Sequence, residues 1–331
     1  MLKSYSRSLY FLLLLSVFIL ATPTVLKSQA QNDDSKSLFL ADPTIFFNKG
    51  TYYLYGTGSG NGYAAYTSKD LKSWHGPVGN SSGMALRKGD SYGTSKFWAP
   101  QVFKYNDKFY MAYAADEHIG IAVSDSPLGP FKQAKIAPVS EDVKQIDPFF
   151  FMDDNGKKYL YYVIVANGGN RIFVAEMNDD MMTVKEETEK LCIEATKPWE
   201  NTANSQWIVT EGPTVIKHKK LYYLLYSAND FRNVDYAVGY AVSKSPMGPW
   251  TKYDRNPFIN RINVGQNGSG HGDIVKGKKG ELFYVLHTHN SATKVSPRRT
   301  AIVRIRFMKD GKSGIDKLSI VDGTFRFLKL K

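Results

Sequence analysis

The sequence of 331 residues has almost no cysteine, with Cys192 as the single example. One cysteine cannot form an internal disulfide, so a small disulfide-stapled domain is excluded. Cys192 is also a poor candidate for a nucleophile, because no histidine lies near it in the sequence. A chain of this length with 43% hydrophobic residues can instead be stabilised by a large apolar core.

Helical periodicity is also missing, since no segment repeats apolar residues at a spacing of three or four over several turns. This absence disfavours helix-rich α/β folds. Aromatic residues make up 14% of the chain, with 21 Tyr and 19 Phe, and both types favour β-strands. No linker or low-complexity segment follows Ser35, so we expect a single domain over residues 36–331.

A mainly apolar run lies close to the N-terminus. Lys3 and Arg7 precede this run, which extends over Tyr10–Ala21, and small residues follow near Ala30. The run is short for a transmembrane helix and is typical of a signal peptide. We therefore expect a signal peptide over residues 1–30 and a secreted or periplasmic protein that has no membrane association after cleavage. An uncleaved membrane anchor is the alternative.

The formal net charge of +12 is compatible with an acidic polysaccharide or a nucleic acid as partner. The lysines, however, are scattered through polar turns, such as Lys217–Lys220 and Lys276–Lys279. Scattered lysines are typical of a solvated surface. We therefore expect no nucleic acid partner.

Five segments share one pattern, in which a short apolar stretch is followed by a polar turn and an aromatic stretch. They begin at Asp42, Ala99, Asp147, Gly212 and His271. This pattern is typical of a β-hairpin, and further strand-like stretches bring each unit to about four strands. Such units repeated around an axis form a propeller, so we predict an all-β, five-bladed β-propeller, with a β-sandwich as the alternative. The last apolar stretch, residues 317–330, would close the ring by pairing into the first or last blade.

The repeat places ionisable side chains at the same point of several units. The innermost strands of a propeller line a central channel, so Asp42, Asp147, His271 and Glu211, which precedes Gly212, should converge there. Carboxylates are costly to bury together unless they have a function. Two carboxylates beside a sugar linkage are the catalytic pair of glycosidases. A single Asp-Pro would mark a turn, but its recurrence at one position favours a catalytic site.

These residues also resemble a known family. The motifs Ala41-Asp42-Pro43, Ile146-Asp147-Pro148 and Thr210-Glu211-Gly212-Pro213, with Trp98-Ala99-Pro100 between the first two, resemble those of glycoside hydrolase family 43 in order and spacing. The resemblance covers about residues 38–310. It implies that Asp42 is the general base that activates water, that Glu211 is the general acid, and that Asp147 tunes and orients this acid. It also implies inversion of the anomeric configuration.

The resemblance extends to metal and substrate. It implies that no cofactor is required for the chemistry, although calcium or a water associated with His271 could lie near the axis. It implies arabinose- or xylose-containing plant polysaccharides as substrates, so we expect a monomeric exo-α-L-arabinofuranosidase that acts on polysaccharide side chains. The alternatives are a β-xylosidase, a galactofuranosidase or an endo-arabinanase. A non-catalytic sugar-binding propeller is the alternative class, which the presence of all three carboxylates disfavours.

Other residues near these motifs are candidates for substrate binding. Phe97 and Trp98 could form a stacking wall for a sugar ring, and Trp207 is a weaker candidate for the same role. His271 is flanked by small residues that leave its ring free, which favours a role in the site. The resemblance also implies that an arginine at the position of Arg298 or Arg299 reaches the substrate, and the sequence leaves the choice between them open.

His287 and His289 would lie on one face of an expected strand, as a metal-binding pair can. No third ligand accompanies them in the sequence. A packed or surface role is therefore favoured over metal binding.

Overall fold

The computed structural model describes Met1 and residues 36–58, 60–311 and 314–331. The predicted signal peptide lies outside these ranges. Among the described residues, no helix is both long and apolar enough to cross a membrane. The chain from residue 36 onward forms one compact body, which is described by itself below.

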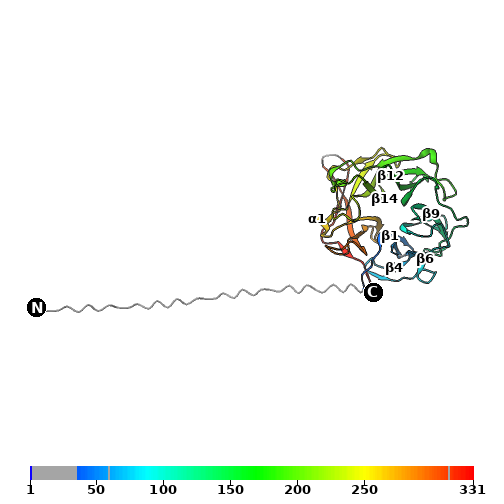
Figure 1. The fold of residues 1–331 in the computed structure, drawn as a ribbon, viewed down its shortest axis with the longest axis horizontal. Coiled ribbons are helices and arrows are strands. Elements are labelled where there is room, and N and C mark those ends of the chain that lie inside the picture. Colours follow the sequence, from blue (N-terminus) through cyan, green and yellow to red (C-terminus); the bar gives the residue numbers. More distant parts are fainter. Residues whose placement is uncertain (2–35, 59, 312–313) are drawn as a thin grey trace. The chain divides into compact units, whose positions relative to one another are not determined.

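This body is a five-bladed β-propeller, as the repeat predicted (Figure 1). Blade I contains β1 (Ala41–Asn48), β2 (Thr51–Thr57), β4 (Tyr66–Ser68), β5 (Ser73–His75) and β23 (Lys329–Leu330). Blade II contains β7 (Trp98–Tyr105), β8 (Lys108–Ala115) and β9 (His118–Ser124). Blade III contains β10 (Gln145–Met152), β11 (Lys158–Ala166), β12 (Gly169–Glu176) and β13 (Lys190–Ile193).

Blade IV contains β14 (Ile208–His218), β15 (Leu221–Ala228), β16 (Ala237–Ser243) and β17 (Thr251–Lys252). Blade V contains β18 (Gly270–Lys276), β19 (Leu282–Thr288), β20 (Arg299–Met308), β21 (Lys317–Ile320) and β22 (Arg326–Phe327). The remaining elements are the strand pair β3 (Gly62–Ala64) and β6 (Met84–Arg87), the 3-10 turns Glu186–Thr188 and Pro198–Glu200, and the short helix α1 (Arg261–Val264). The innermost strands β1, β7, β10, β14 and β18 contact one another in cyclic order around the axis.

Tight turns explain why the repeated segments form hairpins. In the first hairpin Asn48 pairs with Thr51, so Lys49 and Gly50 alone form the turn. Their φ angles are 45° and 78°, the left-handed backbone that matches the twist of the two strands. Gly50 adopts this conformation without steric cost because it lacks a Cβ.

The apolar core is divided into five clusters, each of which lies between two neighbouring blades. Between blades II and III, for example, the rings of Phe103 and Phe150 stack with their centroids 4.0 Å apart. Between blades I and II, Tyr63 and Tyr113 pack edge to face. The aromatic residues that are abundant in the sequence therefore serve mainly to join the blades.

Blade II differs from the predicted four strands. It has three strands, and a single bridge between Val123 and Lys132 stands where a fourth would be. The segment that leads to this bridge contains Pro127 and Pro130, which lack the backbone N–H that a longer ladder requires. Phe131 nevertheless packs in the core between blades I and II, and its side chain is fully buried.

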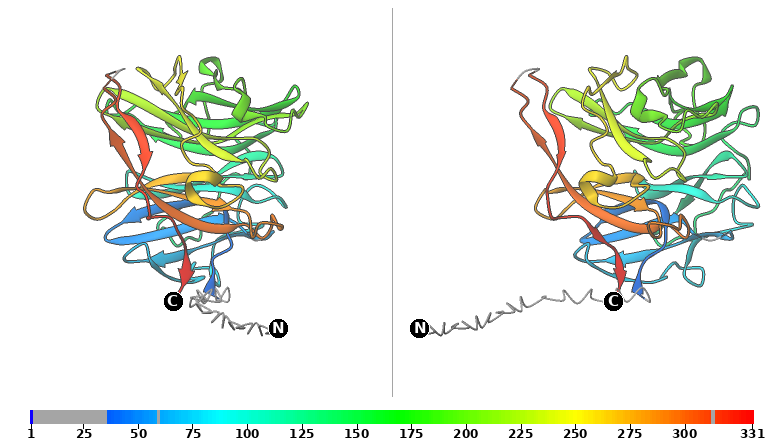
Figure 2. Two further views of the ribbon diagram at one scale, coloured as in Figure 1. Left: turned by 90° about the vertical axis from the view of Figure 1, so that its left-hand side faces the viewer. Right: turned by 60° about the vertical axis from the view of Figure 1, so that its left-hand side comes forward.

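The C-terminal segment closes the ring, as predicted, but not as one continuous strand. Within this segment β21 and β22 pair with β20 of blade V, whereas β23 pairs in parallel with β5 of blade I. Between them the Leu328 N–H donates to the Thr300 carbonyl, and the Leu328 carbonyl accepts from Leu38 N–H. Figure 2 shows the end of the chain, in red, alongside the first blade, in blue. The seam of the ring therefore joins blade V to blade I through both ends of the described chain.

A substitution at Leu328 tests how much the seam contributes to the stability of the fold. Its side chain is fully buried in the cluster between blades V and I, together with Leu38, Trp74 and Ile302. We expect Leu328→Ala to lower the free energy of unfolding by about 2–5 kcal/mol, because it removes buried methyl groups and leaves a cavity. Urea unfolding followed by tryptophan fluorescence measures this change.

The control for this prediction is Lys331→Ala, because the Lys331 side chain is exposed and should change the free energy of unfolding by less than about 0.5 kcal/mol. Equal urea midpoints for Leu328→Ala and the wild type would contradict the prediction.

Candidate active site

The innermost strand of every blade contains the same irregularity. In each one the pairing with the neighbouring strand shifts at a single point. The residue at this point has a left-handed backbone, with φ of 49° at Asp42, 42° at Ala99, 55° at Asp147, 59° at Gly212 and 39° at His271. Outside glycine such a conformation costs about 1–3 kcal/mol and is concentrated at functional sites. A bulge re-aims the side chain at that point, and here it happens in all five blades.

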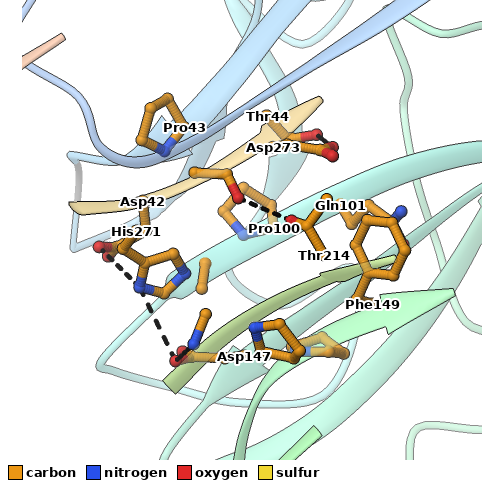
Figure 3. Close-up of a pocket in the computed structure, with 15 residues that line it drawn as sticks. Asp42, Pro43, Thr44, Pro100, Gln101, Asp147, Phe149, Thr214, His271 and Asp273 are labelled. Atoms are coloured by element: carbon orange, nitrogen blue, oxygen red, sulfur yellow. Dashed lines mark hydrogen bonds and ion pairs between the residues drawn. The ribbon is translucent and has the colours of Figure 1, made fainter. Parts of the chain in front are cut away.

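His271 lies between two of the predicted carboxylates (Figure 3). Its Nδ1 atom is 3.3 Å from Asp42 Oδ1 and 3.8 Å from Asp147 Oδ2, and all three side chains are buried. Burial lowers the pKa of His271, the charge of Asp42 opposes this shift, and Arg298 reinforces it. A neutral imidazole therefore separates Asp42 from Asp147.

Asp42 is the carboxylate of the site that forms an ion pair with an arginine. Arg298 Nη1 lies 2.9 Å from Asp42 Oδ1, His287 Nδ1 lies 3.2 Å from the same oxygen, and Thr57 Oγ1 donates to Oδ2 at 2.7 Å. Burial by itself would raise the pKa of Asp42. The charge of Arg298, together with the neighbouring His271 and a hydrogen bond from His287, outweighs burial and holds this pKa well below its usual range. Asp42 is therefore ionised.

Glu211 has a different environment. Its Oε1 accepts from the Tyr236 hydroxyl at 2.8 Å, and its Oε2 accepts from Asn170 Nδ2 at 3.2 Å. Burial raises the pKa of Glu211 to about 7, and the charge of Asp42 adds to this rise, while the hydrogen bonds from Tyr236 and Asn170 oppose it. No lysine or arginine within the described ranges forms an ion pair with Glu211. Glu211 can therefore carry a proton near neutral pH.

Asp147 contacts the backbone next to Glu211. Its Oδ2 accepts a hydrogen bond from the N–H of Gly212, the residue that follows Glu211, at 3.1 Å. Burial raises the pKa of Asp147 well above its usual range, and the charges of Glu211 and Asp42 raise it further. Asp147 and Glu211 therefore compete for protons. The site thus combines one ionised carboxylate, Asp42, with a neighbouring pair that competes for protons, Glu211 and Asp147, and this difference between Asp42 and the pair is the one that general acid–base catalysis by two carboxylates requires.

Two of the candidate substrate-binding residues lie elsewhere: the prediction for Phe97 is wrong, and Arg299 is the one of the two alternative arginines that lies outside the site. Phe97 is only 2% exposed and packs against Tyr63 and Tyr113 between blades I and II, so it cannot contact a sugar. The guanidinium of Arg299 lies 3.8 Å from the ring centroid of Phe327, and its Nη2 donates to Ser37 Oγ, on the seam. Neighbouring residues of an extended chain point in opposite directions, which explains why Phe97 and Arg299 lie away from the site while Trp98 and Arg298 do not.

Arg298 and Trp98, which neighbour these two residues in the sequence, remain candidates for substrate binding. Arg298 reaches Asp42, and its guanidinium lies 4.5 Å from the ring centroid of Phe231, so Arg298 and not Arg299 lies in the site, and its contact with a substrate stays a prediction. Trp98 is partly exposed and directly precedes the bulge at Ala99. Its role as a wall for the substrate stays a prediction.

Sequence reasoning missed four residues of the site. Thr57 and His287 contact Asp42, and Asn170 and Tyr236 contact Glu211. They lie outside the repeated position, so the register of the repeat could not identify them. The sequence did draw attention to the pair of histidines on β19. Its members have separate partners, however, since His289 Nε2 lies 2.8 Å from the Phe231 carbonyl oxygen, away from Asp42.

The residues around His271 do not form a direct binding site for calcium. Calcium takes six to eight oxygen ligands, and the described residues include no cluster of three or more His, Cys, Asp or Glu side chains placed to hold a metal ion. The five bulges and the residues after them surround an axial cavity of about 20 Å³, room for about one water molecule. Calcium held near His271 largely through water stays a prediction, and no step of the chemistry is derived through it.

Comparison with known proteins identifies the class of enzyme that uses this arrangement. The model of the family "Glycosyl hydrolases family 43" matches residues 36–313, and the chain belongs to this family of glycoside hydrolases.

A crystal structure of an endo-1,4-β-xylanase from Bacteroides thetaiotaomicron is similar, with 41% identity, a TM-score of 0.80, and coverage of 89% of this chain and 98% of the other. A β-D-galactofuranosidase of Aspergillus niger is 24% identical, with coverage of 82% of this chain and 81% of its own length. A xylosidase/arabinosidase of Humicola insolens is 29% identical, with coverage of 65% and 79%.

The contact between Asp147 and the acid predicts a change in pH dependence. Loss of the Glu211 proton should limit activity at high pH. An ionised Asp147 disfavours this loss by charge repulsion, so Asp147→Asn, which carries no charge, should lower the pKa of Glu211. We expect the basic limb of the pH profile of kcat/KM to move to lower pH, together with a fall in activity.

The matched control for this prediction is Asp107→Asn, because the Asp107 side chain is fully exposed in the turn between β7 and β8, at the opposite end of β7 from its bulge at Ala99. This variant should keep the wild-type profile. A basic limb that stays in place or moves upward in Asp147→Asn would contradict the assigned role of Asp147.

Proposed function

We propose that this protein is an inverting glycoside hydrolase that removes pentose residues from plant polysaccharides, with α-L-arabinofuranosides as its preferred substrates. One observation carries the mechanistic part of this proposal: Arg298 pairs with Asp42, whereas Glu211 has no cationic partner in the described part of the chain. This difference supports Asp42 as the base and Glu211 as the acid, independently of the order of the motifs.

In the proposed reaction Asp42 accepts a proton from a water molecule, which attacks the anomeric carbon. Glu211 donates its proton to the glycosidic oxygen as the bond to the leaving group breaks. When Asp147, beside Gly212, is ionised, its charge favours the protonated form of Glu211 until the leaving oxygen takes the proton. Because these two residues supply both proton transfers, we propose that the chemistry requires no metal.

The names of the relatives support the choice of sugar. The Humicola relative is named for both xylosides and arabinosides, and the Aspergillus relative acts on a five-membered galactofuranose ring. An arabinofuranosyl group combines the pentose with the five-membered ring. Cleavage of β-1,4-linked xylose is the second candidate, because the Bacteroides structure at 41% identity is described as a xylanase.

A substrate panel with product analysis tests this proposal. We expect the highest kcat/KM on 4-nitrophenyl α-L-arabinofuranoside, relative to the β-D-xyloside and the β-D-galactofuranoside. Proton NMR during the first minutes should show the β-anomer of arabinose, since attack by water inverts the configuration. A preference for the xyloside would select the second candidate. A first product that retains the α configuration would overturn the role of Asp42.

Glu211→Ala tests the acid separately. We expect its kcat on an arabino-oligosaccharide to fall by about 10²–10⁴-fold, because the leaving oxygen then departs without a proton. On a 2,4-dinitrophenyl arabinofuranoside, whose leaving group needs no proton, the loss should be less than about tenfold.

The control is Glu187→Ala, an exposed glutamate in the turn Glu186–Thr188, which should lose no activity on either substrate. Equal losses on the two substrates in Glu211→Ala would show that Glu211 is not the acid.

A further inference from the structure

A second pocket lies on the blade that carries the acid. It has a volume of about 420 Å³, within the range of ligand-binding pockets, and Glu200, Trp207, Val209, Asn229 and Arg232 are among its lining residues. Val209 and Glu211 are two residues apart in β14, so they lie on the same face of that strand. The pocket therefore borders the face of β14 that carries the Glu211 side chain.

The lining of this pocket suits a neutral sugar. Trp207 is 46% exposed, an unusual state for so large an aromatic ring, and offers a face on which the C–H side of a sugar can pack. The remaining walls contribute amide and hydroxyl groups from Asn201, Ser205 and Asn233. Two rim charges, Asp230 and Arg232, pair with each other at 2.6 Å, so they cancel. An anionic ligand would find no unpaired cation here.

The turn that precedes the Trp207 segment and lines one end of the pocket is held in place by a buried carboxylate. Glu200 is fully buried, and its Oε2 accepts from the backbone N–H groups of Thr196 and Lys197 and from Lys252 Nζ. Its Oε1 accepts from the Tyr226 hydroxyl at 2.6 Å. The pocket is therefore preformed, which reduces the entropy that a bound sugar would have to overcome.

A chain of hydrogen bonds connects this pocket to the acid. Trp207 Nε1 donates to Asn170 Oδ1 at 3.0 Å, and Asn170 Nδ2 donates to Glu211 Oε2 at 3.2 Å. Asn170 reaches this position because β12 and β14 of adjacent blades pair in parallel at two points, one of which sets Asn170 beside Val209. Asn170 is itself buried. One side chain thus touches both the wall of the pocket and the acid.

The indole determines which way the Asn170 amide faces. An indole N–H can donate a hydrogen bond but cannot accept one, so the amide oxygen must face Trp207. The amide NH₂ group must then face Glu211, where it can donate but not accept. A donor fixed in this way stabilises the ionised carboxylate that remains after proton transfer.

We propose that this pocket binds the neutral sugar on the leaving-group side of the scissile bond, and that Trp207 fixes Asn170 as a positioning residue for Glu211. The inference rests on the proposed function, since it requires that Glu211 protonate the leaving group. It adds a sugar-binding subsite to the proposed function. It also adds a chain of hydrogen bonds through which Trp207, in the wall of that subsite, influences Glu211.

Three variants separate the two roles of Trp207. Trp207→Ala removes both the ring face and the N–H, Trp207→Phe keeps a face and removes the N–H, and Asn170→Ala removes the donor to Glu211. The control is Phe47→Ala, which removes an exposed aromatic residue at the far end of β1 from Asp42. Each variant is assayed on an arabino-oligosaccharide and on the 4-nitrophenyl arabinofuranoside, with circular dichroism as the check on folding.

We expect Trp207→Ala to raise KM about tenfold on the oligosaccharide, because the leaving sugar loses its platform. On the nitrophenyl substrate its KM should change less than about twofold, since that leaving group has no sugar. Trp207→Phe should keep a KM near that of the wild type on both. Phe47→Ala should match the wild type throughout.

The pH profile tests the connection itself. Without the indole N–H the Asn170 amide can turn and accept from protonated Glu211, and without Asn170 the carboxylate loses a donor. In Trp207→Phe and in Asn170→Ala the basic limb should therefore move upward, by about one pH unit. The other groups that act on Glu211, namely Asp42 of β1, Asp147 of β10, Tyr236, and Arg298, are the same in both variants.

The outcomes of these assays test the subsite, the connection to Glu211 and the proposed function separately. If Trp207→Ala raises KM equally on both substrates or on neither, the subsite is overturned. If the basic limb stays in place or moves downward in both Trp207→Phe and Asn170→Ala, the connection to Glu211 is overturned. If the wild type hydrolyses neither substrate, the proposed function fails before the variants are compared.

Discussion

The ion pair between Arg298 and Asp42 is the interaction on which the site depends. Three carboxylic acids lie around one axis, and burial alone would raise the pKa of all of them. Arg298, assisted by His271 and His287, reverses that effect for Asp42 alone. Its negative charge then raises the pKa of the other two. One guanidinium thus gives chemically similar groups different pKa values, as the proposed base and acid require.

The same ion pair crosses the seam of the propeller. Asp42 belongs to the first strand of blade I, whereas His271, His287 and Arg298 all belong to blade V. The seam is closed by the C-terminal segment, which pairs with both blades. Tyr236 extends this arrangement, since its ring stacks on His287 while its hydroxyl group contacts Glu211. Closure of the ring between blades V and I therefore also brings Asp42 into contact with Arg298, His271 and His287.

The sequence predicted the propeller, the strand that closes it and the convergence of Asp42, Asp147, Glu211 and His271, because the repeat reveals positions that share one structural environment. It could not choose between Arg298 and Arg299, and it misplaced Phe97, because adjacent residues on an extended chain differ in direction and no repeat shows which one faces inward. Asn170 and Tyr236 escaped notice for another reason. Their contacts arise from a bridge between blades and from a loop, and neither feature recurs along the chain.

The position of the seam has a consequence for synthesis of the chain. The ribosome completes the segments that carry Asp42, Asp147 and Glu211 before it reaches Arg298, which lies 256 positions beyond Asp42. An emerging chain therefore holds its acidic groups without the cation that makes Asp42 stable in a buried setting. Blades I to IV cannot assemble an active centre on their own during translation. Catalytic competence must arise late, when the final blade docks against the first.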